Sequence, residues 1–421
     1  MNAGNHELLF ADAIADQLAD PNDVPATTWT APWWRQSLAH GMPGVALLHI
    51  ERAAAGLAPW ERADAWLTAT VRGPVTGGAD SHPFYGVPAV AHALRCAHEH
   101  RPAAYQLALA ALDEQVDRDI RHRLAVANAR LDAGGPARLA DFDAIHGLTG
   151  YGAYLLRRNP DTDLLPAVLD YLVRLTQPRH DDDGGGELPG WWVPTGPSGR
   201  PDPRFPDGHA NTGVAHGIAG PLALLSLAAH RGITVPGHTA AIRTIRGWLD
   251  RWNTGTDWPY WITPAEDRAG RSLVTLPQRP SWCYGVAGVA RAQQLAALAL
   301  ADATRQQHAE RMLVGAVTDA QQLASTTDPS LCHGFAGLAY LAARTAADAQ
   351  ADTADALNAA VPDLISHAAL APANPVQAAV ALLADPDRGA GLLDGAAGIA
   401  LALHGTTRPP ATGWDSCLLI A

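Results

Sequence analysis

The sequence HGIAGPLALL at residues 216–225 decides how this 421-residue chain folds, because close variants of it recur along the chain. There are seven copies, whose leading glycines are Gly41, Gly86, Gly147, Gly217, Gly285, Gly334 and Gly395. A second glycine follows three positions later in six copies, and the second copy has Ala89 there. The intervals between leading glycines run from 45 to 70 residues. Each interval accommodates two helices of about 11–15 residues with loops, which predicts a tandem array of helix pairs.

The two helices of each pair differ in polarity. The residues after each glycine pair are apolar on most faces, which is typical of buried helices. The segments between copies carry the charge, and residues 113–130, 239–252 and 304–323 have apolar positions at helical spacing. An open solenoid needs polar capping repeats, but the terminal copies are as apolar as the middle ones. We therefore predict an all-α fold, a seven-fold α/α toroid of seven inner and seven outer helices. It forms one domain over residues 1–421, with repeats at about 37–405.

Residues 178–211 interrupt the repeats. They are rich in Gly, Pro and Asp and have no helical period. Long irregular segments in compact proteins are usually lids or binding loops, so we expect an irregular insertion here, with short strands around residues 191–193. The aspartates at 181–183 match no calcium-binding loop and are interpreted as a solvated acidic turn.

The composition excludes several classes of protein. The chain has 30 Lys and Arg against 42 Asp and Glu, a net charge of −12, which argues against binding to nucleic acid. Apolar stretches such as 217–229 are shorter than the roughly 20 residues of a membrane span. The first 20 residues lack the basic start of a secretory signal. Four cysteines in this length do not make a disulfide framework. We expect a cytoplasmic protein.

Two cysteines occupy equivalent positions in successive copies. Cys283 and Cys332 each stand two residues before a leading glycine, and His333 follows the second. A closed ring brings such positions together, and two thiolates with one imidazole suit Zn²⁺ with an open fourth position. That site favours an incoming thiol over hydrolysis, because zinc binding removes the proton of the thiol. Two buried thiols beside a hydrogen-bonded histidine are the alternative. Cys96 and Cys417 lie off the motifs and are expected to be inert.

Other polar residues lie at the same edges of the repeats. His216 leads its copy, and Asp143 stands four residues before Gly147. An imidazole paired with a carboxylate is a candidate general acid and base. Arg279, four residues before Cys283, either stabilises developing negative charge or braces its loop. His40 and His146 are interpreted as caps of their loops.

The cysteine motifs together resemble a known family. The chain has Asn211 before His216-Gly217, Arg279 before Trp282-Cys283-Tyr284-Gly285, and then Cys332-His333-Gly334. This combination is similar to the lanthionine synthetase C-like proteins, and the glycine motifs extend the resemblance over about residues 37–405. The resemblance implies a seven-fold α/α toroid and a small β-rich extension, for which 178–211 is the candidate. It implies zinc ligands at Cys283, Cys332 and His333. It implies catalytic roles for Asp143, His216 and Arg279, with Tyr284 beside the metal.

The reaction implied by the resemblance is the cyclisation of a dehydrated precursor peptide. A peptide cysteine adds as its thiolate to dehydroalanine or dehydrobutyrine and forms a thioether ring, the (methyl)lanthionine. The repeats leave no room for a dehydratase domain, so a separate dehydratase is an expected partner. The leader-bearing precursor peptide and an exporter are the others. The cytoplasm is the expected location, with peripheral association to a biosynthetic complex at the membrane as a variant.

Three other functions compete with this interpretation. One is a glutathione-adding enzyme of the same family that acts on dehydrated proteins. Another is a zinc-stabilised scaffold that binds peptides without chemistry. A toroidal glycosidase is disfavoured, because such enzymes use paired carboxylates and the motif edges here have few.

Overall fold

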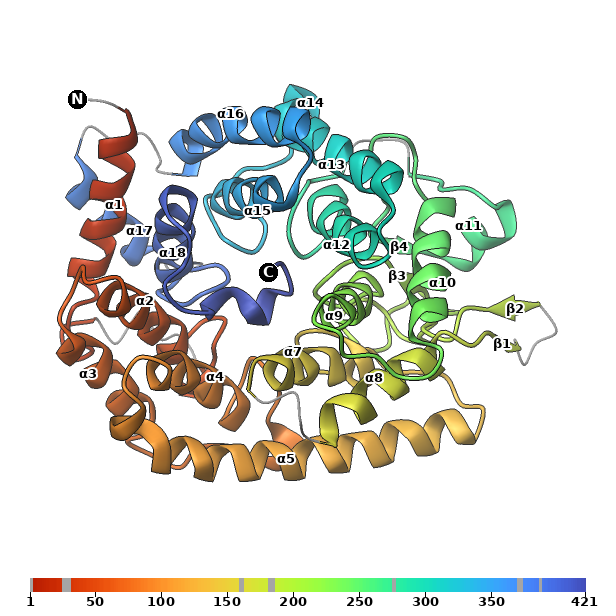
Figure 1. Cartoon of the computed structure of the whole chain (residues 1–421), viewed down its shortest axis with the longest axis horizontal. Helices are drawn as coiled ribbons and strands as arrows, with labels where there is room; N and C mark the ends of the chain where they lie inside the picture. The colour runs from red at the N-terminus through yellow and green to blue at the C-terminus, as the bar shows by residue number, and fades with distance from the viewer. Residues whose placement is uncertain are drawn as a thin grey trace. The chain divides into compact units, whose positions relative to one another are not determined.

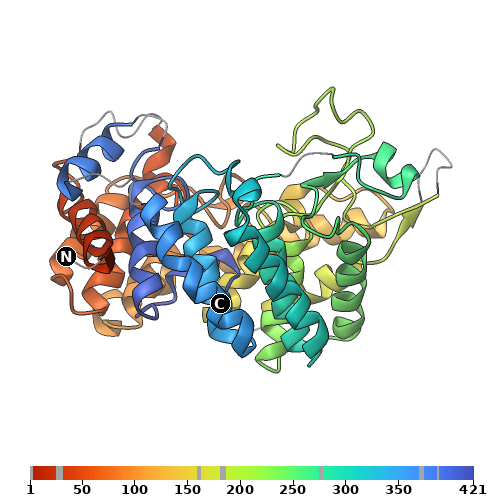
Figure 2. The same cartoon turned by 90° about the horizontal axis from the view of Figure 1, so that it is seen from above.

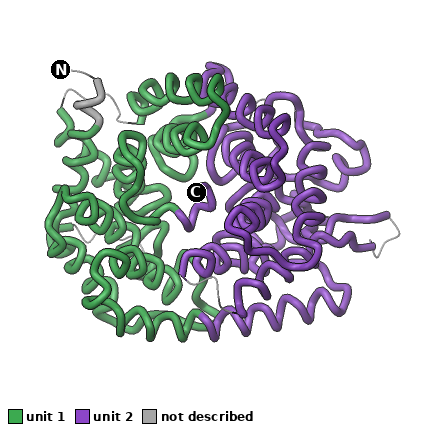
Figure 3. Tube along the Cα trace, in the orientation of Figure 1, with its two compact units in different colours: residues 1–116, 326–415 green, residues 117–325, 416–421 purple. Residues whose placement is uncertain are grey.

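The computed structural model describes residues 3–24, 32–158, 163–180, 186–274, 278–368, 374–385 and 388–421. The chain divides into two compact units (Figure 3). Unit 1 comprises residues 1–116 and 326–415, and unit 2 comprises 117–325 and 416–421. The first boundary falls within helix α5 (Pro102–Asp132). A single domain over 1–421 stays a prediction, and the aspartates at 181–183 lie outside the described residues.

Seven helices begin at, or within two residues of, the seven leading glycines, as the repeat predicts. They are α2 (Met42–Ala54), α4 (Val87–His98), α7 (Leu148–Arg158), α9 (Ala219–His230), α12 (Val286–Ala299), α15 (Phe335–Asp348) and α18 (Ala396–Thr407) (Figure 1). Nearly all their residues are buried, in agreement with their apolar sequences. Within unit 1, α2 packs on α4 and α18, and α18 packs on α15. Within unit 2, α9 packs on α7 and α12.

The glycines of the motif are required by geometry. Gly285 has φ +77°, in the region that favours glycine, and begins α12. The second glycine of a copy lies against the carbonyl group six residues before it. A Cβ at Gly398 would collide with the carbonyl of Leu392, and the same relation holds for Gly337 and Leu331. The inner helices that begin with such a glycine therefore start in close contact with their own entry loops.

A second set of helices packs on the inner ones. These are α3 (Trp60–Thr70) on α2, α8 (Leu164–Leu175) on α7, α10 (His238–Arg251) on α9, α13 (Ala303–Thr318) on α12, and α16 (Ala351–Ala368) on α15. α1 (Ala3–Gln17) and α17 (Pro375–Ala384) pack on α18. The predicted helix at 113–130 lies within α5, and the one at 239–252 matches α10 to within a residue. The helix predicted at 304–323 is split, because Asp319 ends α13 and caps α14 (Ala320–Leu323).

The described strands are two residues long. β1 (Arg179–His180) pairs antiparallel with β2 (Glu187–Leu188), and β3 (Ala210–Asn211) pairs antiparallel with β4 (Trp261–Ile262). Around residues 191–193, where the sequence predicts strands, the structure has one isolated bridge, between Val193 and His209. The remaining short helices are η2 (Pro32–Gln36), η3 (Gly78–Asp80), α6 (Leu139–Phe142), α11 (Pro264–Ala269) and η4 (Trp414–Leu418). Figure 2 shows that the strands of unit 2 gather at one end of its helices.

Candidate active site and metal ligands

A recurring turn shapes the loops before the inner helices. In four copies, the side chain four residues before the leading glycine accepts a hydrogen bond from the backbone N–H three positions on. The pairs are Ser37–His40, Asp143–His146, Ser281–Tyr284 and Ser330–His333. Serine and aspartate favour such turns because their short side chains reach the nearby backbone. In the third copy a carboxylate oxygen accepts this hydrogen bond in place of a hydroxyl, and the second oxygen of the carboxylate can make other contacts.

Asp143 uses its two oxygens differently. Oδ1 accepts hydrogen bonds from the N–H groups of His146 and Gly147, at 2.6 and 2.8 Å. Oδ2 faces Nδ1 of His216 at 2.6 Å and Nδ1 of His146 at 3.3 Å. The Asp143 side chain is fully buried. Burial opposes its ionisation, but the hydrogen bonds from the two histidines outweigh burial and hold the pKa of Asp143 well below its usual range.

The pairing with Asp143 raises the pKa of His216. Burial alone would lower its pKa, but the hydrogen bond and charge of Asp143, together with the charge of Cys283, raise the pKa of His216 above its ordinary value of 6.5. Its side chain stays 25% exposed. The residue is thus a partly accessible imidazole whose pairing with Asp143 favours its protonated form.

Backbone hydrogen bonds join the three motif loops of unit 2. Ala144 N–H donates to the carbonyl of Ala215 at 3.0 Å, and Val214 N–H donates to the carbonyl of Cys283 at 3.1 Å. Asp143, His216 and Cys283 are therefore held on adjoining loops of one unit. The sequence predicts this meeting, because each of the three residues stands within four positions before a leading glycine.

Four further residues of the same unit form a series of contacts that begins at His216, and Tyr260 joins it through its ring contact with Tyr284. Tyr284 has its ring centroid 6.4 Å from that of His216, and its hydroxyl accepts a hydrogen bond from Nδ2 of Asn211 at 3.3 Å. Arg279 is half-buried, and its carbonyl accepts from the hydroxyl of Tyr260 at 2.9 Å. Burial raises the pKa of Tyr260 to about 12, despite the opposing charge of Arg279. Tyr260 therefore stays protonated beside this guanidinium.

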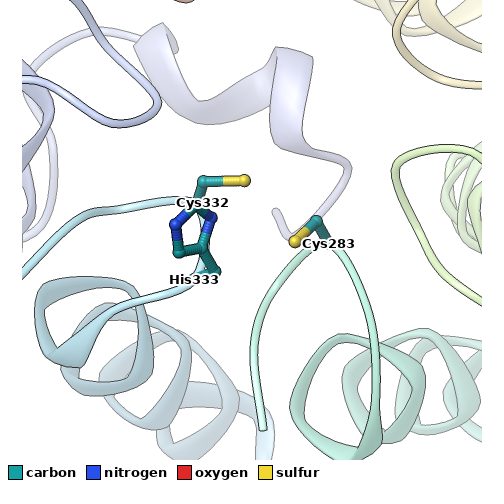
Figure 4. Close-up of side chains that lie close together, drawn as sticks. All are labelled: Cys283, Cys332 and His333. Carbon is teal, nitrogen blue, oxygen red and sulfur yellow. The ribbon is translucent and has the colours of Figure 1, made fainter. Parts of the chain in front are cut away.

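Cys332 and His333 belong to unit 1, in the loop before α15 (Figure 4). Cys332 N–H donates to the carbonyl of Leu393 at 2.8 Å, which joins this loop to the one before α18. The two nitrogens of His333 face carboxylates: Nδ1 lies 3.5 Å from Asp394 and Nε2 lies 3.7 Å from Asp328. An aspartate beside the imidazole orients a metal-ligating histidine in many zinc sites.

Cys283 comes from unit 2, in the loop before α12 (Figure 4). Its side chain is buried, and its sulfur lies 3.5 Å from Oγ of Ser281. Cys283 and Cys332 are present as thiols rather than disulfides, as are the buried Cys96 and Cys417. Two thiols and one imidazole are a donor set that zinc takes in proteins. Since Cys283 and the pair Cys332-His333 belong to different units, their joint binding of one ion stays a prediction.

Sequence reasoning missed several of these residues. His146 was interpreted as a loop cap, but its ring also reaches Asp143 and stacks on His216, with centroids 5.5 Å apart. The carboxylates of Asp328 and Asp394 beside His333 were not anticipated. The position four residues before the glycine, which holds serine in three copies and aspartate in one, is the signal that would have separated Asp143 from an ordinary turn residue.

Comparison with known families decides which protein family has this arrangement. The model of the lanthionine synthetase C-like protein matches residues 32–419. The chain belongs to this family. The resemblance noted from the cysteine motifs is thereby confirmed.

Two members of the family illustrate the relation. The chain is 25% identical over 206 residues to the nisin biosynthesis protein NisC of Lactococcus lactis subsp. lactis, and the match covers 47% of each chain. The aligned part thus spans about half the length of that relative. The solved structure of a nisin cyclase matches 93% of both chains with a TM-score of 0.75 at 20% identity. This likeness confirms the all-α fold class, the helical toroid. Among the described residues, none of the helices combines the length and apolar character needed to cross a membrane.

Proposed function

We propose that this member of the lanthionine synthetase C-like family is a zinc-dependent peptide cyclase. It adds cysteine thiolates to dehydroalanine or dehydrobutyrine of a dehydrated precursor peptide and so forms (methyl)lanthionine rings. The observation that carries the proposal is the Asp143–His216 pair on a loop bonded to that of Cys283. An acid with a raised pKa thus lies beside a thiol of the candidate metal set. Family membership over residues 32–419 supports the same activity.

The zinc ligands in this proposal are Cys283, Cys332 and His333, with a fourth position open to the substrate thiol. The residues fit the metal by donor type, and both cysteines occupy the same place two residues before a leading glycine. When bound, zinc lowers the pKa of a coordinated thiol so that the thiolate forms near neutral pH. Asp394 is suited to orient His333 through Nδ1, at 3.5 Å.

In this proposal the residues of unit 2 stabilise the negative charge of the intermediate and supply the proton that completes the reaction. As the thiolate bonds to the β-carbon of the dehydro residue, the double-bond electrons move to the α-carbon and its carbonyl, which gives an enolate. His216, protonated because Asp143 raises its pKa, donates its proton to the α-carbon. The proton lost by the thiol balances this one, so the product has the mass of the substrate. We assign Arg279 to the enolate charge and Tyr284 to the wall beside His216.

The proposed reaction needs other components. The dehydro residues must come from a separate dehydratase, and the substrate is a precursor peptide that carries a leader. An exporter of the finished peptide is a further candidate partner. We place the reaction in the cytoplasm.

The test uses a dehydrated peptide with one cysteine, incubated with the purified zinc-loaded protein. We expect loss of the free thiol without a change in mass, because the addition is an isomerisation. A mass gain equal to glutathione, when glutathione is supplied, would instead identify the glutathione-adding activity. An unchanged thiol with tight peptide binding would identify a scaffold.

A metal assay tests the ligands separately. Cys283→Ala and Cys332→Ala should each lose most of the bound zinc, whereas Cys96→Ala, a buried cysteine away from the motifs, should keep it. Full zinc retention in Cys283→Ala would contradict the assignment. Circular dichroism of each variant shows whether the helices persist.

A further inference from the structure

One carboxylate oxygen of unit 2 faces two imidazoles. Oδ2 of Asp143 lies 2.6 Å from Nδ1 of His216 and 3.3 Å from Nδ1 of His146. The other oxygen is held by two backbone N–H groups of the turn. Because the turn fixes Oδ1, the direction of Oδ2 does not depend on protons of the imidazoles.

The three side chains form a compact set of metal donors. Their ligand atoms all lie within 4.8 Å of one another. Bonds from zinc to imidazole and carboxylate are about 2.0–2.2 Å long, so neighbouring ligand atoms of a tetrahedral ion lie roughly 3.4 Å apart. Shifts of less than about 1 Å would bring the two nitrogens and the oxygen to that spacing.

We infer that Asp143, His146 and His216 form a second divalent-metal site, which takes Zn²⁺ or a metal of similar preference. Two imidazoles and one carboxylate are a common ligand set for such metals. With both imidazoles neutral, as metal binding requires, the site carries the single negative charge of the carboxylate. The predicted cysteine site, with two thiolates and one imidazole, carries two negative charges and has softer donor atoms, so zinc fills it first.

The surroundings give a metal ion access. The side chain of His146 is 43% exposed and that of His216 is 25% exposed, whereas the carboxylate between them is buried. Arg123 donates a hydrogen bond to the carbonyl of His146 at 3.3 Å and is the nearby positive charge that opposes a cation.

The second site has a consequence that rests on the proposed function. A metal ion bound there takes the place of the proton that His216 donates, so excess zinc should inhibit the cyclase. His146 neither donates nor accepts the transferred proton in the proposed chemistry, although its ring faces Oδ2 of Asp143. Its removal should therefore weaken the second site while the cysteine site keeps its ion.

The test titrates Co²⁺ into the full-length protein already loaded with one equivalent of zinc. Cobalt on nitrogen and oxygen ligands absorbs weakly in the visible, whereas cobalt on thiolate adds a strong near-ultraviolet band. We expect one further equivalent of Co²⁺ without the thiolate band, and an affinity lowered at least about 10-fold in His146→Asn. His122→Asn removes an exposed histidine of α5 outside the set and should bind as the parent protein does.

Two results would overturn the inference: no second equivalent in the parent protein, or undiminished binding in both His146→Asn and His146→Gln. Thermal unfolding of both variants separates loss of the ligand from loss of the fold. Excess zinc should also slow cyclisation by the parent protein more than by His146→Asn. A protein that takes the second metal but cyclises no peptide would refute the proposed function and leave the metal site standing.

Discussion

Replacing Asp143 by serine separates the two tasks of this residue. Ser37, Ser281 and Ser330 make the same turn in other copies, so a hydroxyl at position 143 should hold the loop before α7. The substitution removes Oδ2, and with it the partner of His216. Asp143→Ala is the companion variant, because it removes both the turn and the pairing.

The expected magnitudes follow from the hydrogen bonds that each variant removes. A buried hydrogen bond to a charged group contributes about 1.5–3 kcal/mol, so Asp143→Ser should lower the free energy of unfolding by about 2 kcal/mol. Asp143→Ala should lower it by about 1 kcal/mol more, as the removal of a helix cap does. Without the carboxylate, burial dominates and the pKa of His216 falls below 6.5, so the imidazole is neutral at pH 7. The rate of cyclisation should then fall about 100-fold or more.

The pH dependence of the stability difference has a definite sign. The pKa of His216 is raised in the folded protein, so its share of the stability is complete below its unfolded value of 6.5 and is lost as pH rises through the folded value. The pKa of Asp143 is lowered, so its share is present above 3.8 and is lost as pH falls through the folded value. The parent protein should exceed Asp143→Ser in stability most clearly between about pH 4 and 6.5.

The assay measures thiol loss from the dehydrated peptide, zinc content and chemical unfolding for the parent protein and both variants. Zinc content should stay at one equivalent in Asp143→Ser. A cyclisation rate within about threefold of the parent value would refute the role of Oδ2, since acid catalysis contributes far more. Equal instability of the serine and alanine variants would refute the account of the turn.

Three further predictions concern other residues. Arg279→Gln should slow cyclisation about 10-fold or more. Arg279→Lys should slow it less, because lysine keeps the positive charge and loses only the planar guanidinium group with its paired donors. Equal rates in all three proteins would indicate that Arg279 only braces its loop. Ser330→Ala should cost about 1 kcal/mol in unfolding free energy and weaken zinc binding, because the turn at His333 loses its acceptor, whereas Ser366→Ala on the exposed face of α16 should be neutral in both measurements. Burial of His209 lowers its pKa to about 4, so below pH 6.5 the unfolded chain binds a proton that the folded protein does not. The free energy of unfolding of the parent protein should therefore fall by about 3 kcal/mol between pH 6.5 and 4, and His209→Gln should lack this loss. The same pH dependence of the unfolding free energy in both proteins, measured with urea, would contradict this.

The inner helices were predictable because a glycine motif marks the beginning of each one in the sequence. The glycines and the apolar run require both close backbone contact and burial, and one of the seven inner helices follows the leading glycine of every copy. The strands were not predictable, because two residues are too few to show an alternating pattern. The split at Asp319 depends on one side chain that accepts a hydrogen bond from Gln321, which competes with a continuous helical period.

The candidate site was predictable to the extent that its residues share a register with the glycines. Cys283 and Cys332 at two positions before the glycine lie where backbone hydrogen bonds join neighbouring loops, so the repeat alone indicates their place. The interpretation of His146 as a loop residue covers only one of its contacts: its backbone N–H donates to Oδ1 of Asp143 within the turn, and its ring separately faces Oδ2. A sequence pattern indicates the contact that the backbone makes within its own turn, but it gives no indication of the contact that the side chain makes with another residue.

The repeat also explains how a stable scaffold accommodates reactive groups. The turn four residues before the glycine needs an oxygen acceptor, and serine or aspartate supplies it equally well. The change from hydroxyl to carboxylate at Asp143 therefore leaves the loop intact and adds an ionised oxygen in the buried interior. Charge burial is costly unless it is paired, and the histidines at 146 and 216 provide that pairing. The acid that the proposed reaction needs thus follows from stabilising a buried carboxylate, since the same hydrogen bond that keeps Asp143 ionised raises the pKa of His216.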